Sequence, residues 1–310
     1  MTVWFVPRDA AALSVGADDV AAALEALGEQ VVRTGSRGLL WLEPLVERAD
    51  SRNGTRVGWG NVRASDLSES APADTASNFL GVVEELDYLA CQNRWIYARV
   101  GIIDPVDPDD YLSHGGMAGL QRALDLSPAS VIEQVTESGL RGRGGAGFPT
   151  GIKWQTVAEQ APVPHKGDPV DAARHKYICV NADEGDSGTF ADRMLMEGDP
   201  FCLLEGMAIA AHAVGADRGM IYLRSEYPAA IAVMSEAIEK ARDRGWLGQG
   251  ILGSSCNFDV TIRVGAGSYV CGEETAMLES LEGRRGTVRA KPPLPAIDGL
   301  FGTPTVINNV

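Results

Sequence analysis

The chain has 310 residues, of which 45% are hydrophobic and 22% are charged, an ordinary balance for a folded protein. It carries 27 Lys and Arg against 42 Asp and Glu, a formal net charge of −15, and so acidic a surface disfavours nucleic acid and anionic membranes as partners. At about 150 residues per domain, this length suggests two domains.

Cysteine usage and the first residues favour a cytoplasmic protein without a bound metal. No two cysteines have a Cys-x-x-Cys spacing, so neither a zinc ribbon nor an iron–sulfur cluster is expected. Residues 1–9 do not resemble a signal peptide, and the longest apolar stretch, 202–216, is too short to cross a bilayer. A metal site from His165, His175 and Cys179 would have an unfamiliar spacing and is given little weight. The five cysteines are Cys91, Cys179, Cys202, Cys256 and Cys271.

Residues 1–110 are predicted to form a small α/β domain. Asp18 is expected to cap a helix over 19–27, whose apolar residues share one face. The predicted order β-α-β-β-α-β suggests a thioredoxin-type sandwich. Because only Cys91 lies in this part, redox work by a cysteine pair is not expected, and the domain is interpreted as structural or docking. The other predicted elements are strands over 3–6, 38–46, 55–59 and 95–103 and a helix over 79–86.

The acidic, turn-rich segment 104–110 is the predicted boundary to a second domain over 111–310. Strand and helix patterns alternate in that domain, which predicts an α/β fold. Its predicted helices span 116–124, 128–138, 200–214 and 229–244, and its predicted strands span 176–181, 220–224 and 258–264.

Six glycines lie between residues 139 and 151. Glycine lets backbone N–H groups approach a ligand closely, and successive N–H groups at a helix start favour anions. Arg141, Arg143 and Lys153 add positive charge, so this glycine loop is predicted to bind phosphate. The match of 142–147 to G-x-G-x-x-G is not taken as a Rossmann site, because a helix is predicted before it where a strand is required. A flexible loop without a ligand is the alternative.

Carboxylates crowd behind the predicted strand 176–181, where α/β proteins place their ligands. Asn181, Asp183, Glu184 and Asp186 stand there. Their oxygens can accept hydrogen bonds from ribose hydroxyls or from the edge of a flavin ring. A metal ion bound by oxygen ligands and a solvated acidic turn are the alternatives.

Two later segments are also candidates for a ligand site. Glu273 and Glu274 follow the predicted strand 258–264, and they could serve acid/base chemistry or satisfy a helix N-terminus. The proline-rich stretch 289–296 and the stretch 302–310, which contains an Asn-Asn pair, are predicted to form a rigid pocket wall.

Together these segments resemble the NADH-binding flavoprotein family, the diaphorase subunits of respiratory complex I, NAD-reducing hydrogenases and NAD-dependent formate dehydrogenases. The resemblance runs from about Leu126 to Val310. The motifs that carry it, in the family's order, are Gly142-Arg-Gly-Gly-Ala-Gly-Phe-Pro-Thr-Gly151, Asn181-Ala-Asp-Glu-Gly185, Gly272-Glu-Glu-Thr275 and Asn308-Asn309.

Three further segments are most similar to the β subunit of soluble NAD-dependent formate dehydrogenases, in which a cluster-free thioredoxin-like domain precedes the flavin domain. They are Ser36-Arg-Gly-Leu-Leu-Trp-Leu-Glu-Pro-Leu-Val46, Asp186-Ser187 and Lys291-Pro-Pro-Leu-Pro295.

The resemblance implies FMN and NAD as cofactors. It implies no catalytic acid or base, since hydride passes directly between nicotinamide and flavin, and Glu273 and Glu274 would only orient the cofactors. Leu294 stands where the family has a second aromatic ring against adenine. The residues implied to hold the phosphate are Gly142, Arg143, Gly144, Gly145, Gly147 and Lys153. Those implied to line the flavin are Asn181, Asp183, Glu184, Tyr269, Gly272, Glu273, Asn308 and Asn309, and those implied to meet NAD(H) are Phe148, Asp186, Glu274 and Lys291.

The implied function is that of a diaphorase subunit, which passes electrons between iron–sulfur clusters and NAD+/NADH through FMN. The implied partners are a molybdenum- or tungsten-containing α subunit and a [2Fe-2S] γ subunit of a formate dehydrogenase. In the family a Cys-x-x-Cys-x-x-Cys motif follows further on, so a [4Fe-4S] cluster is expected only in that region and the chain is expected to be a fragment.

Other functions remain open at this point. Within the family, the alternative is the flavoprotein subunit of an NAD-reducing hydrogenase or of complex I. From other classes, a non-catalytic docking scaffold and a metal-dependent hydrolase that uses Asp183, Glu184 and Asp186 are alternatives.

Overall fold

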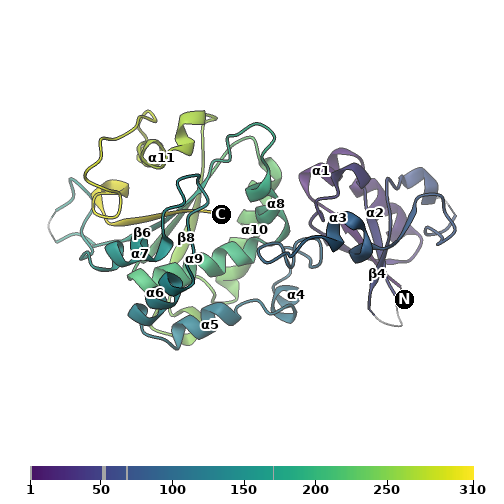
Figure 1. Ribbon diagram of the computed structural model, residues 1–310, viewed down its shortest axis with the longest axis horizontal. Helices are drawn as coiled ribbons and strands as arrows, with labels where there is room; N and C mark the ends of the chain where they lie inside the picture. The colour runs from purple at the N-terminus through teal and green to yellow at the C-terminus, as the bar shows by residue number, and fades with distance from the viewer. Residues whose placement is uncertain (1, 51–53, 68, 170) are drawn as a thin grey trace. The chain divides into compact units, whose positions relative to one another are not determined.

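The computed structural model describes residues 2–50, 54–67, 69–169 and 171–310. The chain divides into two compact units, and each contains a β-sheet of its own (Figure 1). The first unit comprises the residues up to His114 together with Met194–Pro200, and the second comprises Gly115–Arg193 and Phe201–Val310. The mixed α/β class is confirmed, whereas the thioredoxin type of the first unit stays a prediction.

The first unit holds a five-stranded sheet in the order β2-β1-β3-β4-β5. β1 and β2 pair in parallel, and the other neighbours pair antiparallel. Val20 and Leu24 of α2 join Trp4 and Trp59 in the buried core of this unit. The strands are β1 (Val3–Pro7), β2 (Gln30–Thr34), β3 (Val46–Ala49), β4 (Arg56–Trp59) and β5 (Phe79–Val82). The helices and 3-10 turns are α1 (Ala10–Ser14), α2 (Ala17–Ala26), α3 (Asp87–Ala90), α4 (Pro108–Ser113), η1 (Leu40–Leu42), η2 (Ala64–Leu67) and η3 (Val83–Glu85).

Three predicted elements of the first unit are wrong. Segment 38–46 contains the 3-10 turn η1 in place of a strand, and the carboxylate of Glu43, which follows η1, accepts hydrogen bonds from Ser36 Oγ and Leu45 N. Segment 79–86, predicted as a helix, begins with strand β5, whose residues pair with β4. Segment 95–103 forms turns, and Trp95 within it is 81% exposed.

Two smaller differences concern the boundaries of helices in this unit. The N-cap of α2 is Gly16 with φ 96°, and Asp18 lies inside the first turn. The acidic segment 104–110 already contains the start of α4, whose N-cap Asp107 accepts a hydrogen bond from Asp109 N. Strand β2 was not predicted.

The second unit holds a four-stranded, fully parallel sheet in the order β8-β7-β6-β9. Since all four strands run in one direction, their carboxyl ends meet at a single edge. β6 is buried along its whole length, as is common for parallel strands covered on both faces. The strands are β6 (Tyr177–Ala182), β7 (Arg218–Leu223), β8 (Asp259–Val264) and β9 (Thr305–Asn309).

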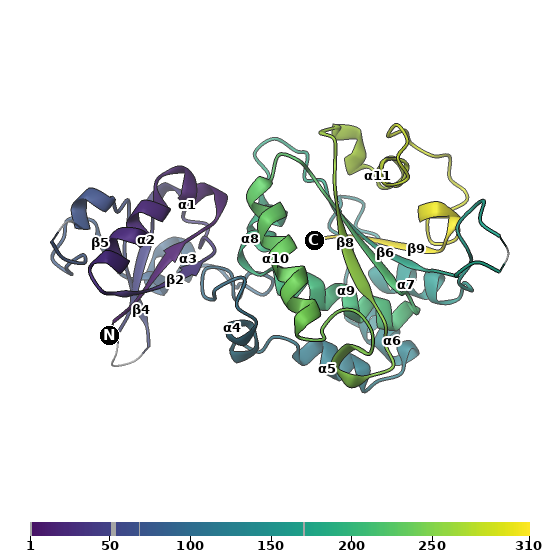
Figure 2. The same cartoon turned by 180° about the vertical axis from the view of Figure 1, so that it is seen from behind.

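Helices cover both faces of this parallel sheet. Cys179 of β6 and Ile307 of β9 pack in one buried cluster with Met277 and Leu278 of α11. Figures 1 and 2 show α11 on one side of the sheet and α9 on the other. The helices and 3-10 turns are α5 (Ala118–Leu124), α6 (Pro128–Glu137), α7 (Thr150–Ala158), α9 (Pro200–Val214), α10 (Pro228–Asp243), α11 (Glu274–Leu281), η4 (Ile251–Gly253), η5 (Tyr269–Gly272) and η6 (Leu300–Gly302). Helix α8 (Ala191–Gly198) begins in this unit, and its residues from Met194 on belong to the first unit.

The predicted elements of the second unit agree closely with the structure. The four predicted helices correspond to α5, α6, α9 and α10, and the three predicted strands correspond to β6, β7 and β8. Helices α7, α8 and α11 and strand β9 were not predicted. Within the described part of the chain, no helix combines the length and apolar character needed to cross a membrane.

Candidate functional site

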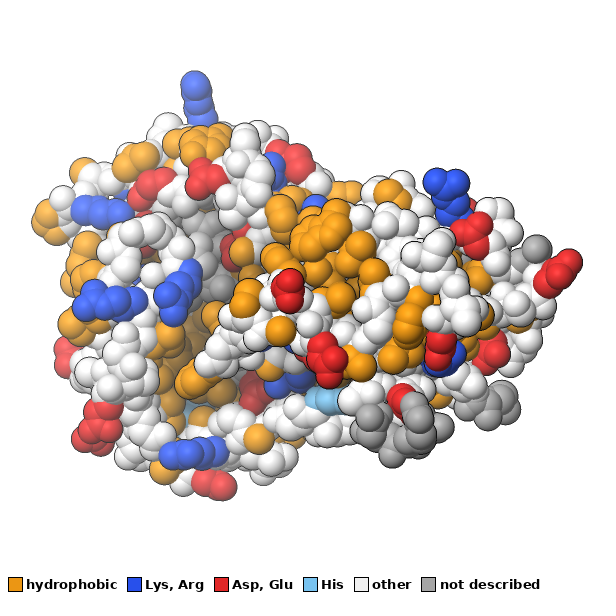
Figure 3. All heavy atoms as spheres, turned by 45° about the vertical axis from the view of Figure 1, so that its right-hand side comes forward, with side chains coloured by type: hydrophobic (Ala, Val, Ile, Leu, Met, Phe, Trp, Pro, Cys, Tyr) orange, Lys and Arg blue, Asp and Glu red, His pale blue; other side chains and the backbone are white. Residues whose placement is uncertain are grey.

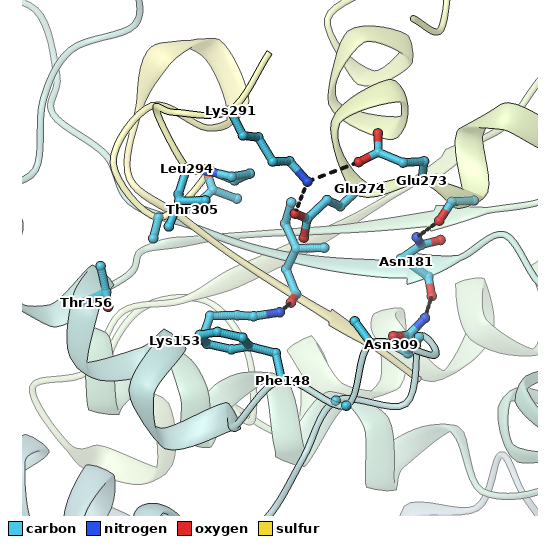
Figure 4. Close-up of a pocket in the computed structure, with 18 residues that line it drawn as sticks. Phe148, Lys153, Thr156, Asn181, Glu273, Glu274, Lys291, Leu294, Thr305 and Asn309 are labelled. Atoms are coloured by element: carbon cyan, nitrogen blue, oxygen red, sulfur yellow. Dashed lines mark hydrogen bonds and ion pairs between the residues drawn. The ribbon is translucent and has the colours of Figure 1, made fainter. Parts of the chain in front are cut away.

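A cavity of about 420 Å³ lies beside the carboxyl ends of β6 and β9 (Figure 4). This edge of a parallel sheet is where α/β proteins bind ligands, and the volume falls in the range of cofactor pockets. The lining residues are Gly142, Gly144, Ala146, Gly147, Phe148, Lys153, Thr156, Asn181, Gly272, Glu273, Glu274, Lys291, Leu294, Pro295, Ala296, Thr305, Ile307 and Asn309.

The glycine loop forms one wall of this cavity and leads directly into α7. Its ends are joined by a hydrogen bond from Gly142 N to Phe148 O at 2.9 Å, which makes it a closed loop. Gly145 and Gly147 have φ angles of 89° and 60°, the left-handed conformation that glycine adopts without strain. A Cβ atom on Gly144 would lie 2.8 Å from Oδ1 of Asn309, so this position also requires glycine.

Lys153 brings a positive charge from α7 to the cavity. Its Nζ donates a hydrogen bond to the carbonyl oxygen of Ile307 at 2.6 Å, which ties α7 to the edge strand β9. Burial lowers the pKa of Lys153. Figure 4 shows Lys153 and Phe148 on one side of the cavity and Lys291 on the opposite side.

On the molecular face in Figure 3, positive and negative side chains are interspersed, so the net charge of −15 does not form one acidic patch there.

Two asparagines mark the strand ends at the cavity. Asn181 of β6 is directly opposite Asn309 of β9 in the sheet register, and Asn309 Nδ2 donates to Asn181 O at 3.4 Å. Asn181 Nδ2 donates to Gly272 O at 2.8 Å, which links β6 to the segment before α11. These bonds hold three separate chain segments around one end of the cavity.

Glu273 and Glu274 stand at the N-terminus of α11. Glu273 is the N-cap and accepts hydrogen bonds from Thr275 N at 2.8 Å and Ala276 N at 2.9 Å. Lys291 Nζ lies 2.6 Å from a Glu274 oxygen and 3.2 Å from a Glu273 oxygen. Burial opposes charge on Glu273, but the hydrogen bonds from Thr275, Ala276 and Lys291 hold its pKa below the usual range. Both carboxylates are thus held in place by fixed partners, as is expected of orienting groups.

The structure brings eleven of the residues implied by the resemblance into the cavity wall. They are Gly142, Gly144, Gly147, Phe148, Lys153, Asn181, Gly272, Glu273, Glu274, Lys291 and Asn309. The other seven lie outside that wall: Arg143, Gly145, Asp183, Glu184, Asp186, Tyr269 and Asn308.

Glu184 has a clear structural role where it lies. Its carboxylate accepts hydrogen bonds from Asp192 N at 3.0 Å and Arg193 N at 3.3 Å, at the start of α8, and from Tyr227 Oη at 3.1 Å. Asp186 accepts a hydrogen bond from Tyr269 Oη at 2.8 Å, and Tyr269 is 72% exposed.

Asp183 and Asn308 are different, because each carries a buried oxygen atom without a partner among the described residues. These atoms are Asp183 Oδ2 and Asn308 Oδ1. Burial raises the pKa of Asp183. Both residues lie one or two positions from a cavity residue in the chain, but their side chains are not part of the cavity wall.

Thr156 is a lining residue that the sequence analysis missed, although it follows Lys153 by three residues and shares its helical face. The stretches 289–296 and 302–310, predicted as a pocket wall, contribute Pro295, Ala296, Thr305 and Ile307 to the cavity. Thr305 and Ile307 alternate with Asn309 along β9 and so face the same side.

The alternative metal sites find no support in the described part of the chain, where no group of three or more His, Cys, Asp or Glu side chains is placed to hold an ion. His165 Nε2 lies 2.9 Å from Tyr177 Oη, and His175 Nδ1 lies 2.7 Å from Asp217 Oδ2. Cys179 is buried in the sheet core.

Comparison with known proteins gives a consistent result. Residues 135–310 match the family described as the Nuo51 FMN-binding domain. An NADH-quinone oxidoreductase subunit of Rhizobium meliloti is 54% identical over 201 residues, which is 64% of this chain and 45% of the relative. The NADP-reducing hydrogenase subunit HndC of Solidesulfovibrio fructosivorans is 49% identical over 219 residues, which is 71% of this chain and 42% of the relative.

A solved structure extends the likeness to the first unit. The crystal structure of an NAD+-reducing [NiFe]-hydrogenase in the H2-reduced state matches with a TM-score of 0.54 and 28% identity, covering 99% of this chain and 50% of the hydrogenase chain. The chain thus spans about half the length of the relatives it matches. Because the family match covers more than half of its residues, the chain belongs to the Nuo51 FMN-binding domain family, as the resemblance in its sequence predicted.

Proposed function

We propose that the cavity at the carboxyl ends of β6 and β9 binds FMN and that hydride passes there between FMN and NAD(H). The observation that carries this proposal is the convergence of the glycine loop, Lys153 and the Asn181–Asn309 pair on one cavity in a member of an FMN-binding family. The relatives named as NADH-quinone oxidoreductase subunits and the NAD+-reducing hydrogenase support NAD(H) as the second ligand.

The residues present fit a flavin mononucleotide. The left-handed glycines leave the loop without Cβ atoms where a phosphate would approach, and Lys153 adds charge next to it. The amide groups of Asn181 and Asn309, which line the cavity, can form hydrogen bonds with the polar edge of a flavin ring or with the ribityl hydroxyls. The loop backbone and Lys153 therefore recognise the anionic end, and the amides recognise the polar ring edge.

Each part of the cavity then has a separate task. FMN supplies the conversion between two-electron hydride chemistry and one-electron carriers. The loop and Lys153 hold the phosphate, and Asn181 with Asn309 fixes the ring end of the site. Lys291, held by Glu273 and Glu274, presents its charge on the opposite wall, where it can meet the pyrophosphate of NAD(H). No side chain has to move a proton for the hydride step.

For the complete protein we propose the diaphorase subunit of a cytoplasmic, NAD-dependent formate dehydrogenase. The support is the sequence of Ser36–Val46 and Lys291–Pro295 and a first unit without cysteine pairs. The partners would be a molybdenum- or tungsten-containing α subunit and a [2Fe-2S] γ subunit. The second candidate is the flavoprotein subunit of an NAD-reducing hydrogenase, which the structural match over 99% of the chain favours.

The first experiment is a visible absorption spectrum of the purified chain before and after anaerobic NADH. A flavin band that bleaches with NADH, with FMN released on denaturation, is the expected result. A colourless protein that FMN cannot reconstitute would overturn the proposal. The complex purified from its native cells with a tagged full-length protein is then assayed for NAD+ reduction by formate and by hydrogen, which separates the two candidates.

A further inference from the structure

Lys176, the residue before β6, is a buried lysine outside the cavity wall. It is 5% exposed. Its Nζ donates hydrogen bonds to three backbone carbonyls: Val157 O at 2.9 Å, Ala158 O at 3.1 Å and Val214 O at 2.9 Å. An ammonium group has three N–H bonds, so every donor of Lys176 is used.

The three acceptors belong to the ends of two helices. Val157 and Ala158 are the last residues of α7, and Val214 is the last residue of α9. The final carbonyls of a helix lack intrahelical partners and carry its partial negative charge. The buried ammonium of Lys176 therefore satisfies these carbonyls and fastens the end of α7 to the end of α9.

The opposite end of α7 is part of the cavity. The glycine loop runs into its first turn, and Lys153 and Thr156 line the cavity from its body. At 1.5 Å per residue, the nine residues of α7 place Lys176 and the glycine loop about 13 Å apart along one rigid helix. A shift of the C-terminal end along the axis is thus transmitted to the N-terminal end.

Sideways movement of α7 is already restricted by another contact. A Cβ atom on Gly151 would lie 2.8 Å from the Cα of Thr136, so α7 and α6 touch closely at this point. Lys153 also ties α7 to β9. Lys176 supplies a further restraint, at the end of the helix.

We propose that Lys176 is a positioning residue for phosphate recognition, because it fixes α7 so that the glycine loop and helix N-terminus meet the phosphate of FMN. This inference rests on the proposed function. Without Lys176, the carbonyls of Val157, Ala158 and Val214 lose the ammonium that joins them, although Val157 O keeps a hydrogen bond from Gln160 N at 3.2 Å. Helix ends shift or admit water to satisfy carbonyls that lose a donor. The flavin ring end, held by Asn181 and Asn309, does not depend on α7 in the same way.

The test separates phosphate recognition from general stability. The dissociation constants of FMN and riboflavin are measured on flavin-free protein by fluorescence quenching, and their ratio reports the contribution of the phosphate. In Lys176→Met the FMN affinity is expected to fall about tenfold, the size of loss that small misplacements of binding groups cause, while riboflavin affinity changes little. The preference for FMN over riboflavin therefore falls.

The control variant changes a hydrogen-bonded cap at the start of another helix, α5. Glu205 accepts hydrogen bonds from Met117 N and Leu120 N at the start of α5, so Glu205→Gln is expected to lower the melting temperature and leave the FMN preference unchanged. If Lys176→Met does not fold, Lys176→Gln, which offers two donors at most, is measured instead, and its FMN preference is expected to fall as well.

The outcomes are distinct. An unchanged FMN preference in a folded Lys176 variant overturns the positioning role and leaves FMN binding intact. A wild-type protein that binds neither flavin overturns the proposed function itself. Equal losses of FMN and riboflavin affinity assign Lys176 a merely structural role and also overturn the inference.

Discussion

Gly144 and Asn309 approach so closely that a Cβ atom on Gly144 would lie 2.8 Å from Asn309 Oδ1. Gly144 belongs to the glycine loop, and Asn309 is the last residue of β9. The contact brings the loop onto the carboxyl end of the sheet, so one side of the cavity closes only if residue 144 has no side chain.

Gly144→Ala is therefore expected to displace the loop or the Asn309 side chain and to lower FMN affinity about tenfold. Gly206→Ala, on the exposed face of α9, is the control, because a Cβ there would meet no neighbouring segment within 4 Å and the residue lies outside the cavity wall. Both affinities are measured by titration of flavin-free protein. Equal affinities for the two variants would show that the close approach has no role in flavin binding.

The second unit could be predicted from sequence because its elements are locally determined. The predicted strand over 176–181 contains the continuous apolar run 177–180, as buried parallel strands do, and α9 and α10 are long enough for their patterns to be unambiguous. Helix α7 was missed because it follows the glycine loop, whose composition favours irregular structure.

The first unit was harder to predict, because hydrogen bonds of individual side chains contribute to its local structure. The mainly apolar segment 38–46 has the composition of a strand, yet the carboxylate of Glu43 accepts hydrogen bonds from Ser36 Oγ and Leu45 N, and the segment contains a 3-10 turn. The role of Glu184 has the same origin, since Tyr227, 43 residues away, helps to turn its carboxylate toward α8. Motif spacing carries no information on such contacts.

Glu184 is expected to affect stability more directly than flavin binding. Glu184→Ala removes the acceptor for two N–H groups at the start of α8, a loss of about 1–2 kcal/mol for a helix cap. Glu184→Gln keeps one acceptor oxygen and should lose less. Urea denaturation of both variants gives the values. A Glu184→Ala protein with wild-type stability but little bound FMN would instead indicate direct contact with the flavin, as the resemblance implies.

Asp192 is expected to make the stability of the protein depend on pH. Burial and the neighbouring Glu184 raise the pKa of Asp192 to about 7 from 3.8. The folded state therefore binds a proton more tightly than the unfolded state, and the stability that this proton provides is lost as the pH rises through about 7.

Asp192→Asn cannot ionise, so its stability relative to wild type is expected to rise between pH 5 and pH 8. After allowance for partial solvent screening, the change is about 1–2 kcal/mol. Denaturation midpoints at several pH values measure it, and Asp243→Asn, at the exposed end of α10, is the control. A flat difference for Asp192→Asn would contradict the raised pKa.

Preference for NAD over NADP is expected to depend on Glu274. Its carboxylate lines the cavity beside Lys291, and a negative charge there repels the 2′-phosphate of NADP. Asp186, the other acidic residue implied to meet the dinucleotide, lies outside the cavity wall and accepts a hydrogen bond from Tyr269. A relative named as an NADP-reducing hydrogenase subunit indicates that the preference differs among related proteins.

Glu274→Gln is therefore expected to raise the affinity for NADPH relative to NADH about tenfold, which corresponds to about 1.4 kcal/mol of removed repulsion. Asp186→Asn is the matched control and should leave this ratio unchanged. Anaerobic titration of the flavin absorbance with each dinucleotide measures both affinities. The opposite result, a ratio changed by Asp186→Asn and not by Glu274→Gln, would contradict this prediction. The 2′-phosphate would then be recognised near Asp186 and Tyr269, and Glu274 and Lys291 would contact another part of the dinucleotide.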